Sequence, residues 1–409
     1  MNEEKVIEIL RDTAYIRTSG SPEELKTAQY IQKQVAELGL TASIEPFAVD
    51  MADIQTAVLT VDGVSCPCEG YRGAGTATVE APFYYLPNMD EASLANCKGK
   101  IVMVEGYLGY WKYQDILTHG AVGFITYCGN MAFADEDIDK RELRSYVHKG
   151  NKIPGVNINV KTAVQLVESG AKTAKIQLAQ HEYTGESRNV VLEMPGEKPE
   201  TIVFTAHYDS TPLSQGAYDN MSGCIGLLAL ARHFADHPHR HSLRFVWCGS
   251  EERGLLGSKA YVAVHEAELD KLVLNINLDM IGSIMGYFHA CATAEPALVD
   301  YIRYFAAEYG FGMDAVQGVY SSDSTPFADK GIPAVSFARL AADECATIHN
   351  RYDTAKVMSA RQQVADMDFL IAFADRMANA AYCPVKREMP DNMKEELDYY
   401  LMRKRRAAK

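Results

Sequence analysis

Two patterns of apolar and polar positions divide this chain. From residue 189 onward, short apolar runs alternate with longer stretches whose apolar positions recur at helical spacing. The short runs are typical of buried strands, and the longer stretches are typical of helices with one buried face. This alternation predicts an α/β fold, a doubly wound mixed sheet sandwiched by helices. We predict strands at 189–192, 201–206, 243–248, 272–278 and 334–337, and helices at 220–235, 254–264, 296–309 and 360–381.

A different pattern fills the segment from residue 41 to residue 184. Short β-like runs, such as 57–61 and 101–104, alternate there with turns, and one helix-like piece spans 111–119. We therefore predict an inserted β-rich domain. Ahead of it, Ser21 and Pro22 are suited to begin a helix that ends at Gly39.

The predicted organisation has three parts. The first is discontinuous and carries the chemistry described below, the second is the insert, and the third is a charged C-terminal tail. We expect the basic run 403–406 in this tail either to be solvated or to dock on an acidic patch of another subunit. The corresponding ranges are 1–40 with 185–390, then 41–184, then 391–409.

Composition narrows the classes of function. A chain of 409 residues suggests about two domains. Hydrophobic residues make up 47% and charged residues 23%, as in soluble globular proteins. The net charge of −14 argues against nucleic-acid and membrane partners and is compatible with peptides that carry a free amino terminus. The oligomeric state leaves no signal in the sequence.

Location and redox state also have sequence signals. The charged start at Met1 lacks the features of a secretory signal, so we expect a cytoplasmic protein, unless the N-terminus was edited and the protein is secreted. Most of the nine cysteines sit in apolar runs, so we expect them to be reduced core residues.

Candidate chemistry begins where the predicted strand 201–206 ends. His207 follows that strand directly, and Asp209 lies two residues further on. In doubly wound sheets, ligands bind beyond the carboxyl ends of the strands. An imidazole there can bind a metal, and a nearby carboxylate can accept its other ring N–H and fix the tautomer.

Four carboxylates and a second imidazole follow in the chain. Glu251 and Glu252 come shortly after the run 243–248, and Asp279 directly follows the run 272–278. Adjacent like charges are costly unless cations neutralise them. Asp219 precedes a predicted helix, where it could cap the helix or bridge two metals. Together with His349, these residues are a ligand set for two zinc ions, with one glutamate left to move protons.

These segments together resemble the five motifs of the dizinc aminopeptidase family that includes aminopeptidase Y and the bacterial leucyl aminopeptidases. The insert resembles the protease-associated domain common in that family. A late loop, 322–327, resembles the family's substrate-pocket loop, although the family often has histidine where Ser324 stands. The five motifs are His207-Tyr208-Asp209, 216–223, Glu251-Glu252-Arg253-Gly254, Asn277-Leu278-Asp279-Met280 and Ile348-His349; the insert's matching segments are 98–102 and 120–123.

The resemblance implies a role for each residue. His207 and Asp279 would hold one zinc, Glu252 and His349 the other, and Asp219 would bridge them. Glu251 would be the general base and acid. Asp209 is the second predicted catalytic residue, because it can fix the tautomer of His207. Substrate contacts would come from Tyr208, Asp323 and Phe327.

The implied function is a zinc-dependent aminopeptidase with two zinc ions per chain, which removes N-terminal residues from peptides. Three alternatives stay open at this point. A single-zinc glutaminyl cyclase-like transferase could retain the same ligands. A carboxypeptidase of the same superfamily would need a basic pocket, for which Arg339 and Arg351 are the candidates. A noncatalytic binding protein on this scaffold would be expected to have lost ligands.

Overall fold

The computed structural model describes residues 1–131, 137–343 and 345–406. The chain forms two compact units: unit 1 comprises Met1–Val49 and Glu186–Lys409, and unit 2 comprises Asp50–Gly185. Unit 2 begins at residue 50 rather than 41 and ends at residue 185 rather than 184. Two long strands, β1 (Ala42–Val61) and β8 (Thr173–Met194), run through these boundaries.

Unit 1 is built on a mixed sheet with strand order β13-β12-β14-β11-β9-β10-β8. The pairs β10–β9, β9–β11 and β11–β14 are parallel, whereas β12–β14 and β10–β8 are antiparallel. The carboxyl ends of β9, β10 and β11 therefore meet at one edge. The strands are β9 (Lys198–His207), β10 (His241–Cys248), β11 (Leu272–Leu278), β12 (Gly286–Thr293), β13 (Met313–Gln317) and β14 (Ala334–Ala341).

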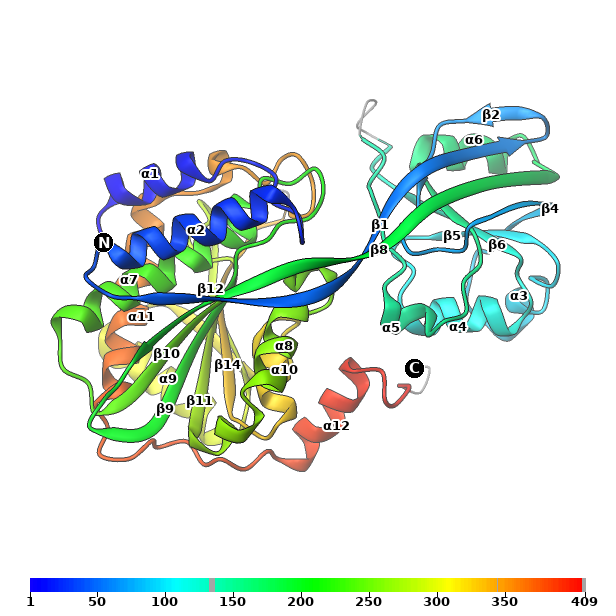
Figure 1. The fold of residues 1–409 in the computed structure, drawn as a ribbon. Coiled ribbons are helices and arrows are strands. Elements are labelled where there is room, and N and C mark those ends of the chain that lie inside the picture. The colour runs from blue at the N-terminus through cyan, green and yellow to red at the C-terminus, as the bar shows by residue number, and fades with distance from the viewer. Residues whose placement is uncertain (132–136, 344, 407–409) are drawn as a thin grey trace. The chain divides into compact units, whose positions relative to one another are not determined.

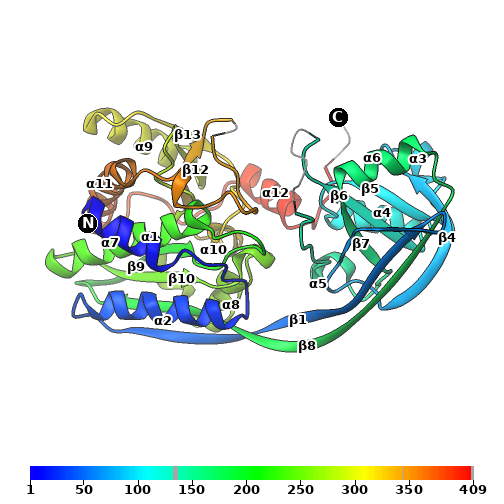
Figure 2. The same ribbon diagram turned by 90° about the horizontal axis from the view of Figure 1, so that it is seen from above.

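Helices cover both faces of this sheet (Figure 1, Figure 2). Alternation along the strands explains why: Phe245 and Trp247 of β10 pack in the larger core cluster, and Val246 and Cys248 pack in a second one. The predicted sandwich of a mixed sheet between helices is confirmed. The helices are α1 (Glu3–Asp12), α2 (Pro22–Ala36), α7 (Ser222–Asp236), α8 (Leu256–Val264), α9 (Pro296–Tyr309), α10 (Ser324–Asp329), α11 (Ala360–Ala378) and α12 (Asp391–Tyr400).

Unit 2 contains more helix than the sequence predicted. Strands β4, β5, β6 and β7 run parallel, and β3 and β8 pair antiparallel at the two ends. The elements are β2 (Val64–Cys66), β3 (Glu69–Gly70), β4 (Ala77–Tyr85), β5 (Ile101–Glu105), β6 (Gly123–Cys128) and β7 (Gly155–Asn159), with α3 (Glu91–Leu94), α4 (Tyr110–Thr118), α5 (Ser145–His148) and α6 (Val160–Glu168).

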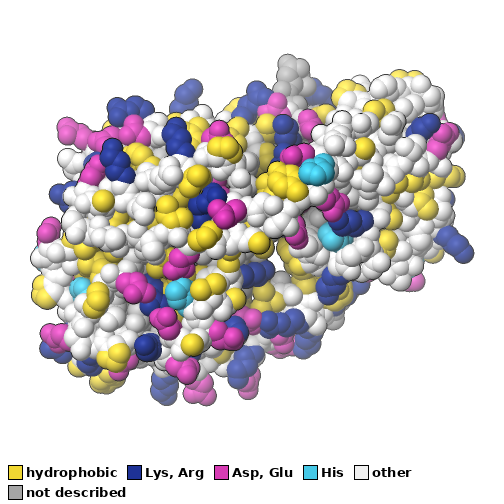
Figure 3. Space-filling model, viewed as in Figure 1, with side chains coloured by type: hydrophobic (Ala, Val, Ile, Leu, Met, Phe, Trp, Pro, Cys, Tyr) yellow, Lys and Arg dark blue, Asp and Glu magenta, His cyan; other side chains and the backbone are white. Residues whose placement is uncertain are grey.

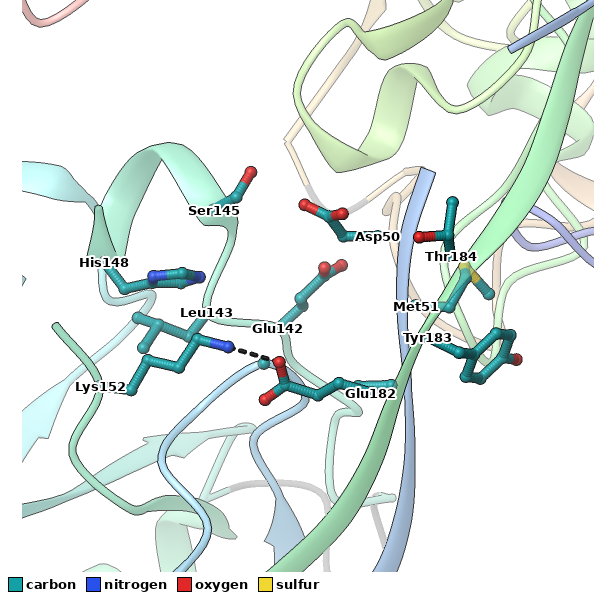
Figure 4. A pocket seen from close by; sticks show the side chains of 12 residues that line it. Asp50, Met51, Glu142, Leu143, Ser145, His148, Lys152, Glu182, Tyr183 and Thr184 are labelled. Carbon is teal, nitrogen blue, oxygen red and sulfur yellow. Dashed lines mark hydrogen bonds and ion pairs between the residues drawn. The ribbon is translucent and has the colours of Figure 1, made fainter. Parts of the chain in front are cut away.

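A pocket of about 330 Å³ opens within unit 2 (Figure 4). Its lining includes the carboxylates of Asp50, Glu142 and Glu182, and Lys152 Nζ forms an ion pair with Glu182 Oε2 at 2.6 Å. Among the residues that the structure describes, all groups of three or more metal-type donors lie in unit 1 instead.

The C-terminal segment differs from the predicted charged tail. Helix α12 places Met393 and Leu397 in a small core cluster with Ala328, so residues up to 400 are packed. From the basic run, Arg403 donates to both carboxylate oxygens of Asp329, at 2.7 and 2.6 Å. An acidic residue of the same chain therefore binds this cation.

Charged side chains of both signs are interspersed over the face shown in Figure 3. None of the helices in the described parts of the chain is long and apolar enough to span a membrane.

Candidate metal centre

The ligand candidates come from the edge of the sheet where β9, β10 and β11 end. His207 is the last residue of β9, and Asp279 directly follows β11. Glu251 and Glu252 lie in a single 3₁₀ turn, η2 (Glu251–Arg253), just after β10. Asp219 lies in the turn that precedes α7, where its backbone is not helical. Parallel strands thus gather side chains that are far apart in sequence.

Two clusters of donor atoms share the carboxylate of Asp219. His207, Asp219 and Asp279 form one cluster, and Asp219, Glu252 and His349 form the other. Asp219 Oδ1 lies 3.1 Å from His207 Nε2, and its Oδ2 lies 3.1 Å from His349 Nε2. Glu252 Oε2 is also 3.1 Å from His349 Nε2. Imidazole nitrogens with carboxylate oxygens fit zinc, and a carboxylate that faces both clusters fits a bridging role.

The electrostatics of the clusters favour cations. Burial raises the pKa of Asp279 to about 8, although His207 offsets part of this effect. Burial also raises the pKa of Glu251 well above its ordinary value, and the neighbouring Glu252 adds to the shift. Asp219 differs: the imidazoles of His207 and His349 lower its pKa despite its burial. Carboxylates this close and buried hold protons unless divalent cations neutralise them.

Asp209 anchors the turn that carries the two glutamates. Its Oδ1 accepts the backbone N–H of Glu251 at 2.9 Å, and its Oδ2 accepts that of Glu252 at 3.2 Å. Its Oδ1 also lies 3.4 Å from His207 Nδ1, but this contact lacks hydrogen-bond geometry. The sequence predicted a role for Asp209 in orienting His207, whereas its hydrogen bonds go to the glutamate turn.

Asn220 also positions the site. Asn220 Nδ2 donates to the carbonyl of Leu278 at 2.9 Å, and its Oδ1 accepts the N–H of Met280 at 3.0 Å. It therefore ties the Asp219 turn to the backbone on either side of Asp279. This role was missed, although the position of Asn220 directly after Asp219 was a visible signal.

Asp353 also supports the Asp219 turn. Its two oxygens accept the backbone N–H groups of Tyr218 at 2.8 Å and Asp219 at 3.1 Å. The partners are more than a hundred residues away in sequence, so no local pattern could reveal the contact.

The three residues expected to contact substrate are buried. Tyr208 donates its hydroxyl to the Arg188 carbonyl at 2.6 Å, and Asp323 accepts from the Ser258 hydroxyl at 2.5 Å. Phe327 packs in the core cluster on the α8 side of the sheet. These placements do not favour substrate contact, because adjacency to a motif in sequence does not determine which way a side chain points.

The two adjoining donor clusters at the edge of the sheet form a candidate metal centre. Residues 189–373 match Peptidase family M28. The chain is 28% identical to aminopeptidase YwaD of Bacillus subtilis over 339 residues, or 78% of this chain and 71% of that protein. It is 31% identical to leucine aminopeptidase 2 of Trichophyton rubrum over 199 residues, or 46% of this chain and 38% of that protein.

Among solved structures, a zinc aminopeptidase from Bacillus subtilis superposes with a TM-score of 0.78 and 25% identity, covering 95% of this chain and 97% of that one. The similarity to Peptidase family M28 lies within unit 1.

Proposed function

We propose that the chain is a zinc-dependent aminopeptidase that hydrolyses the N-terminal peptide bond of peptides with a free amino end. The observation that carries this proposal is the pair of donor clusters that share Asp219, with Glu251 beside them and outside both. His207 and Asp279 would hold one zinc ion, and Glu252 and His349 the other. Bound zinc supplies Lewis acidity, which polarises the scissile carbonyl and lowers the pKa of water.

The protein's own part of the chemistry falls to Glu251. Its Oε2 lies 3.9 Å from His207 Nε2, at the rim of the first cluster. A positioned carboxylate there can take a proton from the attacking water and deliver it to the leaving amine, which typically contributes about 10²–10⁴-fold in rate. Asp209 serves this step by fixing the backbone of the turn that carries Glu251.

The finer assignments belong to the same proposal. They are two zinc ions per chain, a cytoplasmic location and a protease-associated character for unit 2. For the carboxypeptidase alternative, one of the two candidates for a basic pocket is already paired, because the guanidinium of Arg339 is bound by the buried Asp366 at 2.6 Å. The cyclase alternative differs in needing one metal.

A screen of aminoacyl chromogenic substrates with the zinc-loaded protein tests the proposal. We expect turnover of free aminoacyl substrates and none of their N-acetylated counterparts. Elemental analysis of the same sample should give two zinc ions per chain. A protein with one zinc that converts N-terminal glutamine to a cyclic product, without hydrolysis, would establish the cyclase instead.

A further inference from the structure

Glu24 is a buried carboxylate outside the metal centre. It lies in the first turn of α2 and has no exposed surface. Its Oε1 accepts the hydroxyl of Ser187 at 2.7 Å and that of Ser250 at 3.4 Å. Its Oε2 accepts the backbone N–H of Gly20 at 2.8 Å. One acid of the N-terminal segment therefore contacts the residue that precedes Glu251.

Ser250 occupies an uncommon backbone conformation. Its φ is +57°, in the left-handed region that residues other than glycine seldom adopt. Such a residue persists when its surroundings determine its conformation. Here the surroundings are the hydroxyl of Ser19, 2.5 Å from the Ser250 hydroxyl, and the carboxyl of Glu24.

The contact between Glu24 and the turn is also close at the backbone. A Cβ atom on Gly249 would lie 3.0 Å from Glu24 Oε1 and 2.7 Å from the Ser187 hydroxyl. Any side chain at position 249 would therefore collide with these groups, and glycine avoids the collision at the start of the turn. The N-terminal segment and β8 together close on residues 249 and 250, directly before the catalytic glutamate.

Helix capping explains only part of this arrangement. The Ser21 hydroxyl oxygen accepts the Glu24 N–H at 3.1 Å, and Glu24 Oε2 accepts the Gly20 N–H, which is a variant of the capping box. A helix cap is normally solvated, and capping uses only Oε2 of Glu24 here. Capping therefore explains neither the complete burial of Glu24 nor the contacts of Oε1 with Ser187 and Ser250.

We propose that Glu24 and Ser250, with Ser19, form a brace through which the N-terminal segment positions Glu251 for proton transfer. Glu24 and Ser250 are positioning residues, since neither is placed to touch the substrate. This inference rests on the proposed function for its kinetic consequences. Its structural consequence, a fixed turn at residues 249–255, is independent of that function.

The test uses the full-length, zinc-loaded protein. We expect Glu24→Ala and Ser250→Ala each to lower kcat by at least about tenfold with KM nearly unchanged, because small displacements of reacting groups reduce rate steeply. The double variant should be no slower than the slower single one, since both break the same brace. Glu24→Gln should keep kcat near wild type, because the amide can accept from Gly20 and donate to the serine hydroxyls.

Ser21→Ala is the matched control. It removes the other half of the α2 cap, so it should lower Tm and leave kcat unchanged. Amide hydrogen exchange gives a readout without catalysis: exchange at residues 249–255 should accelerate in Glu24→Ala and Ser250→Ala but not in Ser21→Ala. If Glu24→Ala does not fold, Ser250→Ala decides the question, because it leaves the cap intact.

Two outcomes overturn the brace. One is a lowered Tm with unchanged kcat and unchanged exchange at 249–255, which would make Glu24 a cap only. The other is a Glu24→Gln protein as impaired as Glu24→Ala, since the neutral amide preserves the contacts. If the wild type cleaves no aminoacyl substrate, the proposed function fails, and the exchange measurement still decides on the brace.

Discussion

Replacing Asp209 separates the geometry of the metal centre from its ligand set. Asp209→Ala removes the carboxylate that binds the backbone N–H groups of Glu251 and Glu252 but leaves both donor clusters complete. Asp209 is fully buried, so water cannot replace its bonds without rearrangement. A buried N–H left unpaired costs about 1–3 kcal/mol, and two are left here, so the turn should lose about 2–6 kcal/mol of local stability.

The kinetic consequence should follow from displacement of Glu251. A shift on the order of 1 Å in a reacting group can cost about 10²-fold in rate. We therefore expect kcat of Asp209→Ala to fall roughly 10²-fold with KM nearly constant, since the affected interaction acts in the transition state. Asp209→Asn keeps one acceptor oxygen, so its kcat should lie between that of wild type and that of Asp209→Ala. Steady-state kinetics on an aminoacyl chromogenic substrate, with zinc content and Tm of each sample, gives the measurement.

A matched control is available in unit 2. Asp62 also binds two consecutive backbone N–H groups, those of Lys172 and Thr173, at 3.0 and 2.8 Å. Asp62 is exposed, so Asp62→Ala removes a similar pair of backbone contacts at a solvated position far from the ligands in sequence, and it should not affect kcat. The reasoning is refuted if folded, zinc-saturated Asp209→Ala retains kcat within about twofold of wild type.

Three other predictions concern the charges of the site and of the brace. If the chain binds the two zinc ions proposed above, Asp219→Ala should lose most of both, because Asp219 contributes to both donor clusters; elemental analysis that finds either site fully retained contradicts the bridge. Glu251→Gln should keep both zinc ions and lose kcat by about 10²–10⁴-fold, because an amide cannot accept the proton; near-wild-type turnover excludes Glu251 as the base. Burial raises the pKa of Glu24 from 4.5 to about 8. Between these pH values the folded protein keeps a proton on Glu24 that the unfolded chain releases. The contribution of Glu24 to the free energy of unfolding therefore falls as pH rises from 4.5 to 8. The stability advantage of wild type over Glu24→Gln should therefore shrink by about 1.4 kcal/mol per pH unit in that window, and urea unfolding that shows a constant difference contradicts the assignment.

The fold class was predictable because its main signal is local. The strands that were predicted are short apolar runs, and the next α-helices after β9, β10 and β14 are α7, α8 and α11. The run 243–248 was predicted as a strand, and β10 spans His241–Cys248. Strands β12 and β13 were missed, because Gly286–Thr293 carries exposed residues at one end and Met313–Gln317 is partly exposed over most of its length.

The candidate ligands could also be predicted from local sequence, because each follows a strand or lies in a short motif. The residues that hold the ligand loops in place could not be predicted in this way. Asp353 binds the Asp219 turn across 135 positions in sequence, and Glu24 reaches Ser250 across 226. Such contacts depend on which loops the sheet brings together, and strand order is not written in any single run of residues. The directions of Tyr208 and Phe327, both buried, depend on packing in the same way.

The residues that anchor the loops and the residues that are candidate metal ligands have different physical roles. Four carboxylates in one buried site repel one another, and metals relieve that repulsion only after they bind. Asp209 and Asp353 bind backbone N–H groups near the ligands, and Asn220 bonds to the backbone beside Asp279, so these anchors hold the loops whether or not cations are present. Loss of a ligand should therefore reduce zinc content, whereas loss of an anchor should leave zinc content intact and reduce rate. These two signatures distinguish the residues that bind metal from those that aim the ligands and the base.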